Sequence, residues 1–541
     1  MEQESTTLDT TMEAAKAAFV EALGAQHVIA DIEVLAKYEK ATFATSQRIP
    51  LVVQPGTVDE IQEVMRIANE YLVPVYPIST GLNTGYGSAV PPRDGCVVME
   101  LKRLNRIVEY DHELGFVRVQ PGVTQQMLYE FLQSRGGKFW LDCTGAYPDH
   151  SMIGNIAERG FGHTPYSDHF AHVGGFEVVL PQGDVLRTGF GQFENAKATS
   201  VYRWGVGPHF DGLFTQSNLG IIVEATIWLM PKPDYMQFFA CRVDRDEDLG
   251  MLIETLKPLR LDGTIKSAMH IGNDYKVISA IQGYPHSLTN GEVPLPRYVL
   301  EAKSKEWDCG PWNATGALYG TRAEVRAARR KIKRALRGKA KRVQFLDENL
   351  LWLAKKVAKP YQWVTGVNLT EMLKVVEPVF GMTRGVPSDS MLPSNYWRKH
   401  ELPEARRDLS PEQDDCGVLW VAPIAPTSGE HATAIWHIVR DTMLTHGFEP
   451  AVSITLLTER TVDCVVNISY DRKIDGEDER AMACHDEMLD KLSTAGYYPY
   501  RLGIQAVSKM PERTMGYEKF LSGIRHSVDP NGILAPGRYL G

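Results

Sequence analysis

The residues best suited to chemistry in this chain lie in a glycine-punctuated loop, residues 77–87, which reads PISTGLNTGYG. Gly81, Gly85 and Gly87 let the backbone turn tightly and bring its amide groups close to something large and polyanionic. Glycines at this spacing also occur in tight turns that bind no ligand. The elements around the loop therefore have to show whether the glycines serve a binding site or only shape a turn. We expect the loop to bind a polyanionic ligand through its backbone.

The segments before the loop are typical of an α/β cofactor site. Residues 50–57 form an apolar run that ends in a Pro-Gly turn, and a second apolar run, residues 73–76, leads directly into the loop. Between them, residues 58–71 predict a helix. The apolar positions of that helix are Ile61, Val64, Met65 and Ile67. The order strand, turn, helix, strand and glycine loop is how an α/β domain builds a cradle for a cofactor.

The length of 541 residues predicts two domains. In the first half of the chain, short β-branched runs alternate with helical patterns, and a proline-bearing joint at residues 230–234 marks a boundary. Two strand-helix-strand units follow, which predict an antiparallel sheet covered by helices. We therefore predict an α+β fold, with a first domain of residues 1–235 to which residues 500–541 return, and a cap domain of residues 236–499.

Composition and charge exclude several classes of protein. The net charge of −9 argues against general nucleic-acid binding, which needs a positive surface. No apolar run reaches the roughly 18 residues of a membrane span, and the first residues lack the basic and apolar parts of a secretory signal, so we expect a cytoplasmic protein. The seven cysteines contain no C-x-x-C pair, and His163, His169 and His172 lack a ligand pattern. Neither a disulfide framework nor a metal site is therefore predicted.

The strongest local charge lies at residues 322–342, which hold eleven basic residues. The apolar positions Val325, Ala328, Ile332 and Leu336 recur at helical spacing. We expect a surface helix with a charged outer face; docking of an acidic redox partner or of a membrane surface is the alternative.

Taken in order along the chain, a set of short motifs resembles the vanillyl-alcohol oxidase and p-cresol methylhydroxylase family of FAD enzymes. The motifs are QPGT at 54–57, PISTG at 77–81, GYG at 85–87, GNIAERG at 154–160, TPYSDH at 164–169, FEVVL at 176–180, LRTG at 186–189, FTQSNLG at 214–220, Tyr500-Arg501, and DPNGILAPG at 529–537. The motifs extend over nearly the whole chain, so the resemblance rests on their order as well as on the residues within each motif.

The resemblance implies an FAD site in the first domain and the C-terminal tail, with the cap domain closing over the isoalloxazine ring. The residues implied to bind FAD are Pro55, Gly56, Thr57, Ile78, Ser79, Thr80, Gly81, Leu82, Asn83, Tyr86, Gly154, Asn155, Arg159, Gly220, Ile221 and Arg538. The backbone amides of residues 78–87 would hold the pyrophosphate, which fits the glycine pattern of the loop.

The resemblance also implies a substrate. In the family, positions that match Tyr86, Tyr500 and Arg501 bind the oxygen of a para-substituted phenol and stabilise it as a phenolate. A phenol titrates near 10, so its ionisation at neutral pH needs roughly 4 kcal/mol of selective stabilisation. One guanidinium and two hydroxyl donors in a dry pocket supply that amount. The ring then releases a hydride from the benzylic carbon to flavin N5 and becomes a para-quinone methide.

Two departures from the family pattern refine these expectations. Val418 stands where histidyl-linked relatives carry the attaching histidine, and no tyrosine lies between Arg398 and Val421, so we expect FAD without a covalent link. The acidic turn near N5 of some relatives is replaced here by a stretch that contains Asp149 and His150. These two residues are candidate bases for hydration of the quinone methide; a turn-stabilising aspartate and a solvent-facing histidine are the alternative.

We thus expect an FAD-dependent oxidoreductase that oxidises 4-alkylphenols or 4-hydroxybenzyl-type alcohols. Its partners would be a small aromatic substrate, O2 or a cytochrome as electron acceptor, and further copies of the chain in a homodimer or larger assembly. Two other enzyme classes stay open. One is the flavin subunit of a cytochrome-coupled methylhydroxylase, and the other is an FAD enzyme of the same fold that oxidises a non-phenolic alcohol or hydroxy acid.

Overall fold

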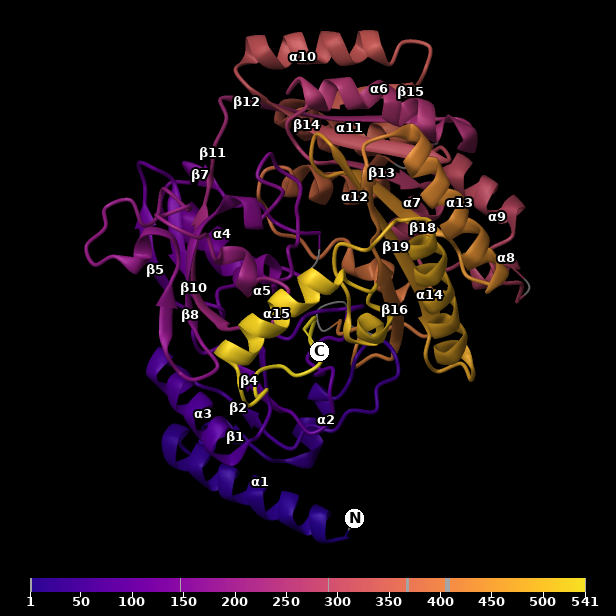
Figure 1. The fold of residues 1–541 in the computed structure, drawn as a ribbon. Helices are drawn as coiled ribbons and strands as arrows, with labels where there is room; N and C mark the ends of the chain where they lie inside the picture. Colours follow the sequence, from indigo (N-terminus) through magenta and orange to yellow (C-terminus); the bar gives the residue numbers. More distant parts are fainter. Residues whose placement is uncertain (1, 146, 290, 366–368, 404–408, 541) are drawn as a thin grey trace.

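A computed structural model of the chain describes residues 2–145, 147–289, 291–365, 369–403 and 409–540. The chain forms two bodies (Figure 1). The N-terminal half lies on one side, and the segments coloured pink to orange lie on the other, while the yellow C-terminal segment runs back between them. The α+β class predicted from the sequence is confirmed.

The first body contains two main sheets. The strands of one are β1 (Val28–Ile29), β2 (Val52–Val53), β4 (Val97–Glu100) and β3 (Val75–Ile78), in that order. The strands of the other are β5 (Ile107–Asp111), β6 (Phe116–Val119), β10 (Ile221–Trp228), β8 (Val173–Val179) and β9 (Val185–Arg187). A short ribbon joins β7 (Phe139–Trp140) to β11 (Met230–Pro231).

Helices cover these sheets and lead into the loops that follow. They are α1 (Glu2–Leu23), α2 (Ile32–Tyr38), α3 (Val58–Tyr71), α4 (Gln125–Ser134) and α5 (Met152–Ala157). The helix predicted over residues 58–71 is α3: Thr57 caps it by accepting a hydrogen bond from the backbone N–H of Glu60, and its predicted apolar positions are all buried. β3, which follows α3, lies parallel to β4 and ends where the glycine loop begins.

The second body is built on one large antiparallel sheet. Its strand order is β15 (Lys341–Leu346), β12 (Tyr235–Val243), β14 (Trp312–Gly320), β13 (Met269–Asn273), β18 (Ala451–Leu456), β19 (Thr461–Asp471) and β16 (Cys416–Val421), with β17 (Ile424–Pro426) also paired to β19. The helices of this body are α6 (Leu249–Leu261), α7 (Asp274–Ile281), α8 (His286–Thr289), α9 (Arg297–Glu306), α10 (Arg322–Ala335), α11 (Glu348–Thr365), α12 (Leu369–Met382), α13 (Gly429–Thr445) and α14 (Glu477–Thr494).

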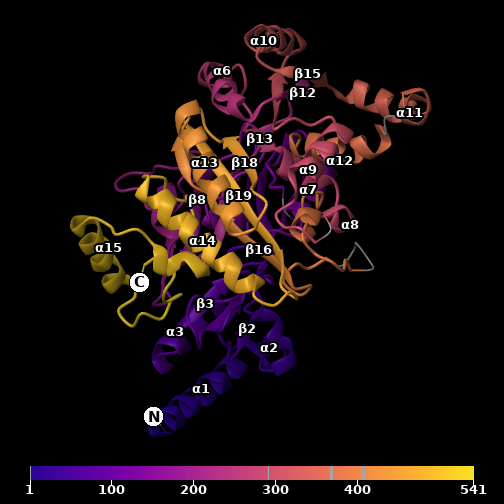
Figure 2. The ribbon, with the colours of Figure 1, turned by 90° about the vertical axis from the view of Figure 1, so that its right-hand side faces the viewer.

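The two faces of this sheet differ in polarity, as alternation along a strand allows. One face packs Ile271, Ile454 and Cys464 into a large apolar core together with side chains of α6, α13 and α14. Figure 2 shows α13 and α14 lying over that face. The neighbouring positions on the same strands, His270, Thr455 and Asp463, point to the opposite face and carry polar groups. The sheet therefore offers its polar face to the interior between the two bodies.

The C-terminal tail returns to the first body. Val75 of β3 donates its N–H to the carbonyl of Ile533 at 2.9 Å, and Ala535 donates to the carbonyl of Val75 at 2.7 Å. The last helix, α15 (Met515–Val528), lies across the first body in Figure 1. These contacts support the predicted return of the tail to the first domain, while the division into residues 1–235 with 500–541 and residues 236–499 stays a prediction.

The basic stretch forms the predicted surface helix, α10, although it ends at Ala335 and the chain continues into β15. Val325 and Ile332 are buried, while most of the arginines and lysines of the helix are exposed. None of the helices in the described ranges is long and apolar enough to cross a membrane.

Candidate functional site

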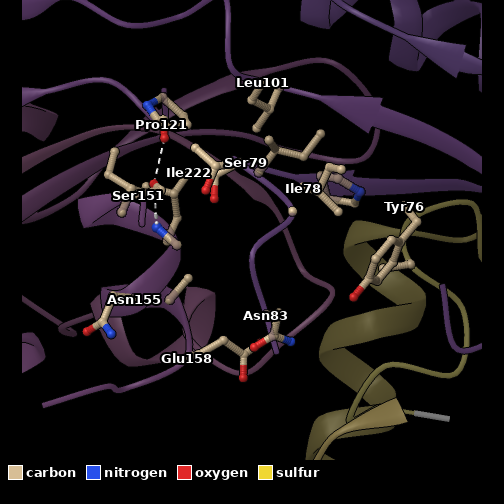
Figure 3. Close-up of a pocket in the computed structure, with 18 of the residues that line it drawn as sticks. Tyr76, Ile78, Ser79, Asn83, Leu101, Pro121, Ser151, Asn155, Glu158 and Ile222 are labelled. Atoms are coloured by element: carbon tan, nitrogen blue, oxygen red, sulfur yellow. Dashed lines mark hydrogen bonds between the residues drawn. The ribbon is translucent and has the colours of Figure 1, made fainter. Parts of the chain in front are cut away.

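A cavity lies where the glycine loop, helix α5 and the C-terminal tail meet. The residues that line it include Tyr76 to Asn83, Ser88, Leu101, Pro121, His150, Ser151, Ile153, Gly154, Asn155, Ala157, Glu158, Phe214, Gln216, Ser217, Gly220, Ile221, Ile222, Arg501, Ala535 and Arg538. Figure 3 shows Ser79 and Ile78 above, Asn155 and Glu158 below, and Asn83 beside Glu158. Segments from four distant parts of the sequence, including residues 214–222, thus enclose one space.

The glycine loop contributes mostly backbone to this cavity. Within the described part of the chain, the amide N–H groups of residues 79–82 donate to no other protein atom. Gly81 has a φ of 72°, in the left-handed region that favours glycine, and this conformation turns the chain along the cavity wall. A run of unpaired amides at a cavity wall is the donor set that a phosphate requires.

Helix α5 approaches the loop closely because of a glycine. A Cβ atom placed on Gly154 would lie 2.4 Å from the Ser79 side-chain oxygen, so a larger residue would collide with the loop. Ser151 begins the helix: its hydroxyl accepts from the N–H of Gly154 at 2.9 Å and donates to the carbonyl of Pro121 at 2.5 Å (Figure 3). These contacts fix the wall opposite the loop.

Asn155 is held by a buried histidine. Nδ1 of His169 lies 2.5 Å from Oδ1 of Asn155, and Nε2 of His169 lies 2.6 Å from Oδ2 of Asp142. Both ring nitrogens of His169 are therefore occupied by hydrogen bonds, one with Asn155 and one with Asp142. No group of His, Cys, Asp or Glu suited to a metal occurs among the residues that the structure describes.

Tyr86 and Arg501 meet at the edge of the cavity although 415 residues separate them in sequence. The guanidinium carbon of Arg501 lies 3.9 Å from the centroid of the Tyr86 ring, a cation–π contact. Nη2 of Arg501 donates to Oδ1 of Asn83 at 2.6 Å, so the glycine loop also orients the arginine. Ile504 donates its N–H to the carbonyl of Tyr86 at 3.1 Å, which binds the tail to the same loop.

Glu158 ties the two arginines of the tail together. Its carboxylate lies 3.7 Å from Nη2 of Arg501 and accepts from Nη2 of Arg538 at 2.5 Å and from the hydroxyl of Tyr539 at 2.9 Å. Burial opposes the charge of Glu158, but Arg538 and Arg501 outweigh it and hold the pKa of Glu158 below its ordinary value. The site therefore carries a net positive charge near its centre.

Tyr500 completes the cluster that the sequence predicts. Its ring packs against Phe161 with centroids 5.8 Å apart, and its backbone carbonyl accepts from Nε2 of Gln216 at 2.9 Å. Burial raises the pKa of Tyr500 to about 12, although Arg501 acts in the opposite direction, and burial also raises the pKa of Tyr86. Both hydroxyls are therefore protonated at neutral pH and are available as hydrogen-bond donors.

The two candidate bases have different surroundings. His150 lines the cavity, its Nε2 is buried without a partner among the described residues, and burial together with the nearby Arg501 charge lowers its pKa to about 4. Asp149 is exposed and is not among the residues of the cavity wall. A neutral imidazole whose ring nitrogen has no described partner can accept a proton.

Several residues predicted to bind FAD lie outside the cavity wall. Pro55, Gly56 and Thr57 belong to the entry of α3, where Gly56 donates its N–H to the carboxylate of Glu60. Arg159 has a φ of 53° at the end of α5, and its side chain bonds to the hydroxyl of Thr215. The left-handed turn directs Arg159 away and leaves Glu158 in the cavity. Tyr86 is not part of the wall either; it stacks on Arg501, which is. The remaining predicted residues, Ile78 to Asn83, Gly154, Asn155, Gly220, Ile221 and Arg538, line the cavity.

Three residues with strong chemical character were not identified from the sequence. Glu158 lies inside a recognised motif beside Arg159, but nothing in the sequence marks it as the partner of Arg501 and Arg538. Asp463 and Lys276 lie on the cap domain, and no motif marks them. Lys276 forms no ion pair with a described residue; its Nζ lies 5.2 Å from the Trp420 ring, and burial lowers its pKa to about 8.

The residues of the cavity fit FAD. Unpaired amides of the glycine loop suit a pyrophosphate, and Arg538 and Arg501 supply positive charge beside it. Gly154 and Gly220 let the segments of the wall pack closely against each other, since a Cβ atom on either would lie 2.4 Å from a neighbouring side chain. The donor set therefore matches the pyrophosphate of a dinucleotide.

Comparisons with known proteins agree with this reading of the cavity. Residues 49–189 match the family model described as an FAD binding domain. The chain is 41% identical to 1'-carboxy-chondrochloren decarboxylase of Chondromyces crocatus, over 98% of this chain and 97% of the relative. It is 29% identical to the 4-cresol dehydrogenase [hydroxylating] flavoprotein subunit of Pseudomonas putida, over 95% and 93%. Its fold matches the 4-ethylphenol oxidase of Gulosibacter chungangensis with a TM-score of 0.88, at 26% identity over 98% and 97%.

Fold and cavity together define an FAD-dependent oxidoreductase. The chain belongs to the vanillyl-alcohol oxidase and p-cresol methylhydroxylase family. The resemblance found in the motifs is thereby confirmed over nearly the whole length of the chain.

Proposed function

We propose that the protein oxidises para-substituted phenols, namely 4-alkylphenols or 4-hydroxybenzyl-type alcohols. The observation that carries the proposal is the cluster at the cavity edge, where the Arg501 guanidinium stacks on Tyr86 and adjoins Tyr500. A relative and a solved structure of similar fold are named for their action on 4-cresol and 4-ethylphenol, which supports a phenol as substrate.

In this proposal the chain's own residues do most of the work on the substrate. Arg501 and the hydroxyls of Tyr86 and Tyr500 bind the phenol oxygen and stabilise its ionised form, so that electron density moves through the ring to the benzylic carbon. FAD, held by the glycine loop, Gly154, Asn155 and Arg538, supplies the acceptor for the benzylic hydride. His150 accepts a proton from the water that adds to the resulting para-quinone methide.

The central test is replacement of Arg501. Arg501→Ala is expected to abolish turnover of 4-ethylphenol while flavin absorbance stays with the protein through gel filtration. Arg501→Lys keeps the charge but loses the planar stack on Tyr86, and it is expected to retain a small fraction of the activity. Turnover by Arg501→Ala at the wild-type rate would rule out the phenolate mechanism.

We also propose that FAD is bound without a covalent link. Val418 lies fully buried on β16, where its N–H donates to the carbonyl of Thr42 at 2.9 Å, and its side chain has no atom that forms a bond to flavin. After acid precipitation, yellow colour is expected in the supernatant. Colour retained in the pellet would contradict this proposal.

A second candidate reaction is oxidative decarboxylation, because the relative at 41% identity is named as a decarboxylase. A substrate with a carboxylate on the carbon next to the benzylic position would first lose a benzylic hydride to FAD. The bond to the carboxylate would then break, CO2 would leave, and the electron pair would form the side-chain double bond and restore the phenolate. The enclosed ammonium of Lys276 supports an acidic substrate group.

Product analysis separates the two reactions. With 3-(4-hydroxyphenyl)propionate, decarboxylation yields one CO2 and one 4-vinylphenol for each flavin reduced, whereas simple oxidation keeps the carboxylate. Lys276→Met is expected to raise the KM for the carboxylated substrate and to leave the KM for 4-ethylphenol unchanged. Equal effects on both substrates would remove Lys276 from carboxylate binding.

The electron acceptor is either O2 or a separate cytochrome, for which the basic face of α10 offers a docking surface. Rapid reoxidation of the reduced protein in air would identify an oxidase, and slow reoxidation would favour the cytochrome-coupled alternative.

If phenols fail as substrates while a hydroxy acid or another non-phenolic alcohol reduces the flavin, the non-phenolic alternative is correct. Light scattering tests the expected homodimer or larger assembly.

A further inference from the structure

Asp463, on β19 of the cap sheet, is a buried acid without a partner. Its side chain has no solvent exposure, and neither carboxyl oxygen has a hydrogen-bond partner among the residues that the structure describes. Burying a carboxyl group without a partner costs free energy, and such groups in native proteins require an explanation. A ligand that bonds to Asp463 would provide one.

The register of the sheet places Asp463 on the same face as Tyr500. Asp463 pairs with Thr455 of β18 on one side and with Ile424 of β17 on the other. β17 in turn bonds to the segment 498–500: Ile424 donates its N–H to Tyr498, and Tyr500 donates to Ala422 at 3.0 Å. Because directly paired residues and residues two apart share a face, Tyr500 and Asp463 both project from the polar face.

The charged and titratable groups around Asp463 are few. On its own face they are Tyr86 and Tyr500, whose pKa values are raised by burial first and by the Asp463 charge in addition. Arg501 stacks on the ring of Tyr86, and His270 pairs with Thr455 from β13 and has a pKa that burial and His163 lower. On the opposite face, the thiol of the adjacent Cys464 is protonated, because burial and then Asp463 raise its pKa.

These surroundings favour the neutral form of Asp463. Burial raises the pKa of Asp463 to about 8, so the carboxyl group carries its proton at pH 7. A carboxylic acid kept neutral in an apolar site is a strong O–H donor to an oxyanion. A carboxylate in the same place would repel a phenolate.

We propose that Asp463, as a neutral acid, donates a hydrogen bond to the phenolate oxygen of the substrate and completes the donor set of Tyr86, Tyr500 and Arg501. The inference rests on the proposed phenol substrate. It adds to the site a residue from the cap sheet, so that substrate binding requires both domains. It also predicts an alkaline limit, since ionisation of Asp463 removes the donor and places a like charge beside the phenolate.

Two substitutions test the donor. Asp463→Asn keeps an N–H donor of similar shape and cannot ionise, whereas Asp463→Leu fills the space without a donor. Binding of 4-nitrophenol is followed by difference spectra from pH 6 to pH 10, since its phenolate is coloured. The affinity of wild type for 4-nitrophenol is expected to fall above about pH 8. Asp463→Asn should bind within about threefold of wild type at pH 7, and its affinity should not fall above that pH. Asp463→Leu should bind at least tenfold more weakly than wild type at pH 7.

Contrary outcomes are equally clear. Equal binding by Asp463→Leu and wild type, or an unchanged alkaline decline in Asp463→Asn, would overturn the role of Asp463. Asp475→Asn, an exposed aspartate of the same domain, is the matched control and should behave as wild type. Flavin absorbance and thermal unfolding verify that each variant is folded.

Infrared difference spectra separate failure of this inference from failure of the proposed function. Wild type minus Asp463→Asn should show the C=O stretch of a protonated carboxyl group at pH 7, with or without phenol. A wild type that shows this band but binds no 4-nitrophenol would contradict the phenol substrate and leave a neutral Asp463. A wild type that binds 4-nitrophenol without this band would contradict the neutral donor.

Discussion

At the scale of single residues, the site depends on one loop that serves two purposes. The backbone of residues 79–82 lines the cavity with amides that donate to none of the described residues, while Asn83 and Tyr86 hold Arg501 through a hydrogen bond and a ring contact. Cofactor and substrate groups are therefore positioned by the same few residues. A change in a side chain of the loop need not disturb what its backbone does.

Tyr86→Phe tests this separation. The ring contact with Arg501 stays, but one donor to the phenolate is lost, which costs about 2 kcal/mol or roughly a thirtyfold fall in kcat/KM. The flavin spectrum and flavin affinity should not change, because the backbone of the loop is intact. Steady-state kinetics with 4-ethylphenol measure the effect.

Tyr202→Phe, at a tyrosine that is half exposed, serves as the control and should keep wild-type kinetics. A Tyr86→Phe protein with unchanged kcat/KM would show that the hydroxyl does not contact the reacting phenol. Loss of flavin from Tyr86→Phe would show that the two purposes of the loop are not separable.

At the scale of elements, α5 and the glycine loop are held in contact by Gly154. In Gly154→Ala the added methyl group would collide with the Ser79 hydroxyl and push the loop, at a cost of about 1–3 kcal/mol. We expect FAD affinity to fall at least fivefold, measured by fluorescence titration of the apoprotein. Removal of the colliding oxygen in the double variant Gly154→Ala, Ser79→Ala should restore most of the loss.

Gly212→Ala is the matched control, since a Cβ atom at Gly212 meets no atom within 4 Å. If Gly154→Ala binds FAD as tightly as Gly212→Ala does, close approach of α5 to the loop is not required for the cofactor. If the double variant is no better than Gly154→Ala alone, the collision with Ser79 is not the cause.

At the scale of the whole molecule, the tail is held to the first domain by β3 and by Glu158. The Glu158 carboxylate joins α5 to Arg501 and Arg538 of the tail. Because these arginines lower the pKa of Glu158, its charge contributes stability that is fully present above the unfolded value near 4.3 and is lost as pH falls through the folded value.

Glu158→Gln should therefore destabilise the protein at pH 7, by about 3 kcal/mol, because two buried guanidinium groups lose their counter-charge. The difference from wild type should begin to shrink as the pH falls below the unfolded value near 4.3, and it should disappear only below the folded value, where the wild type loses the same charge. Urea unfolding at pH 7 and at a series of pH values below about 4.3 measures this. Glu63→Gln, whose ion pair with Arg66 is exposed, is the control, and its stability should differ little from that of wild type. A loss of stability in Glu158→Gln that does not depend on pH would contradict the proposed link to the charge of Glu158.

Much of the molecule follows from the sequence alone, because its determinants are local. The helix over residues 58–71, the turn at Gly81 and the charged face of α10 depend on periodicity and backbone freedom within a few residues. The order of motifs likewise identifies the FAD family, and Val418 argues against a covalent link without any coordinates.

Only the tertiary structure decides which neighbours enter the cavity. The left-handed turn at Arg159 directs this side chain away from the cavity, and its neighbour Glu158 lines the wall instead. In the same way His150 lines the cavity while the adjacent Asp149 is exposed, and the sequence alone does not distinguish the two. Asp463 shares a face with Tyr500 only through the pairing of β19, β17 and the tail. Side-chain facing in a sheet changes with a one-residue shift in register, and register depends on contacts between strands far apart in sequence.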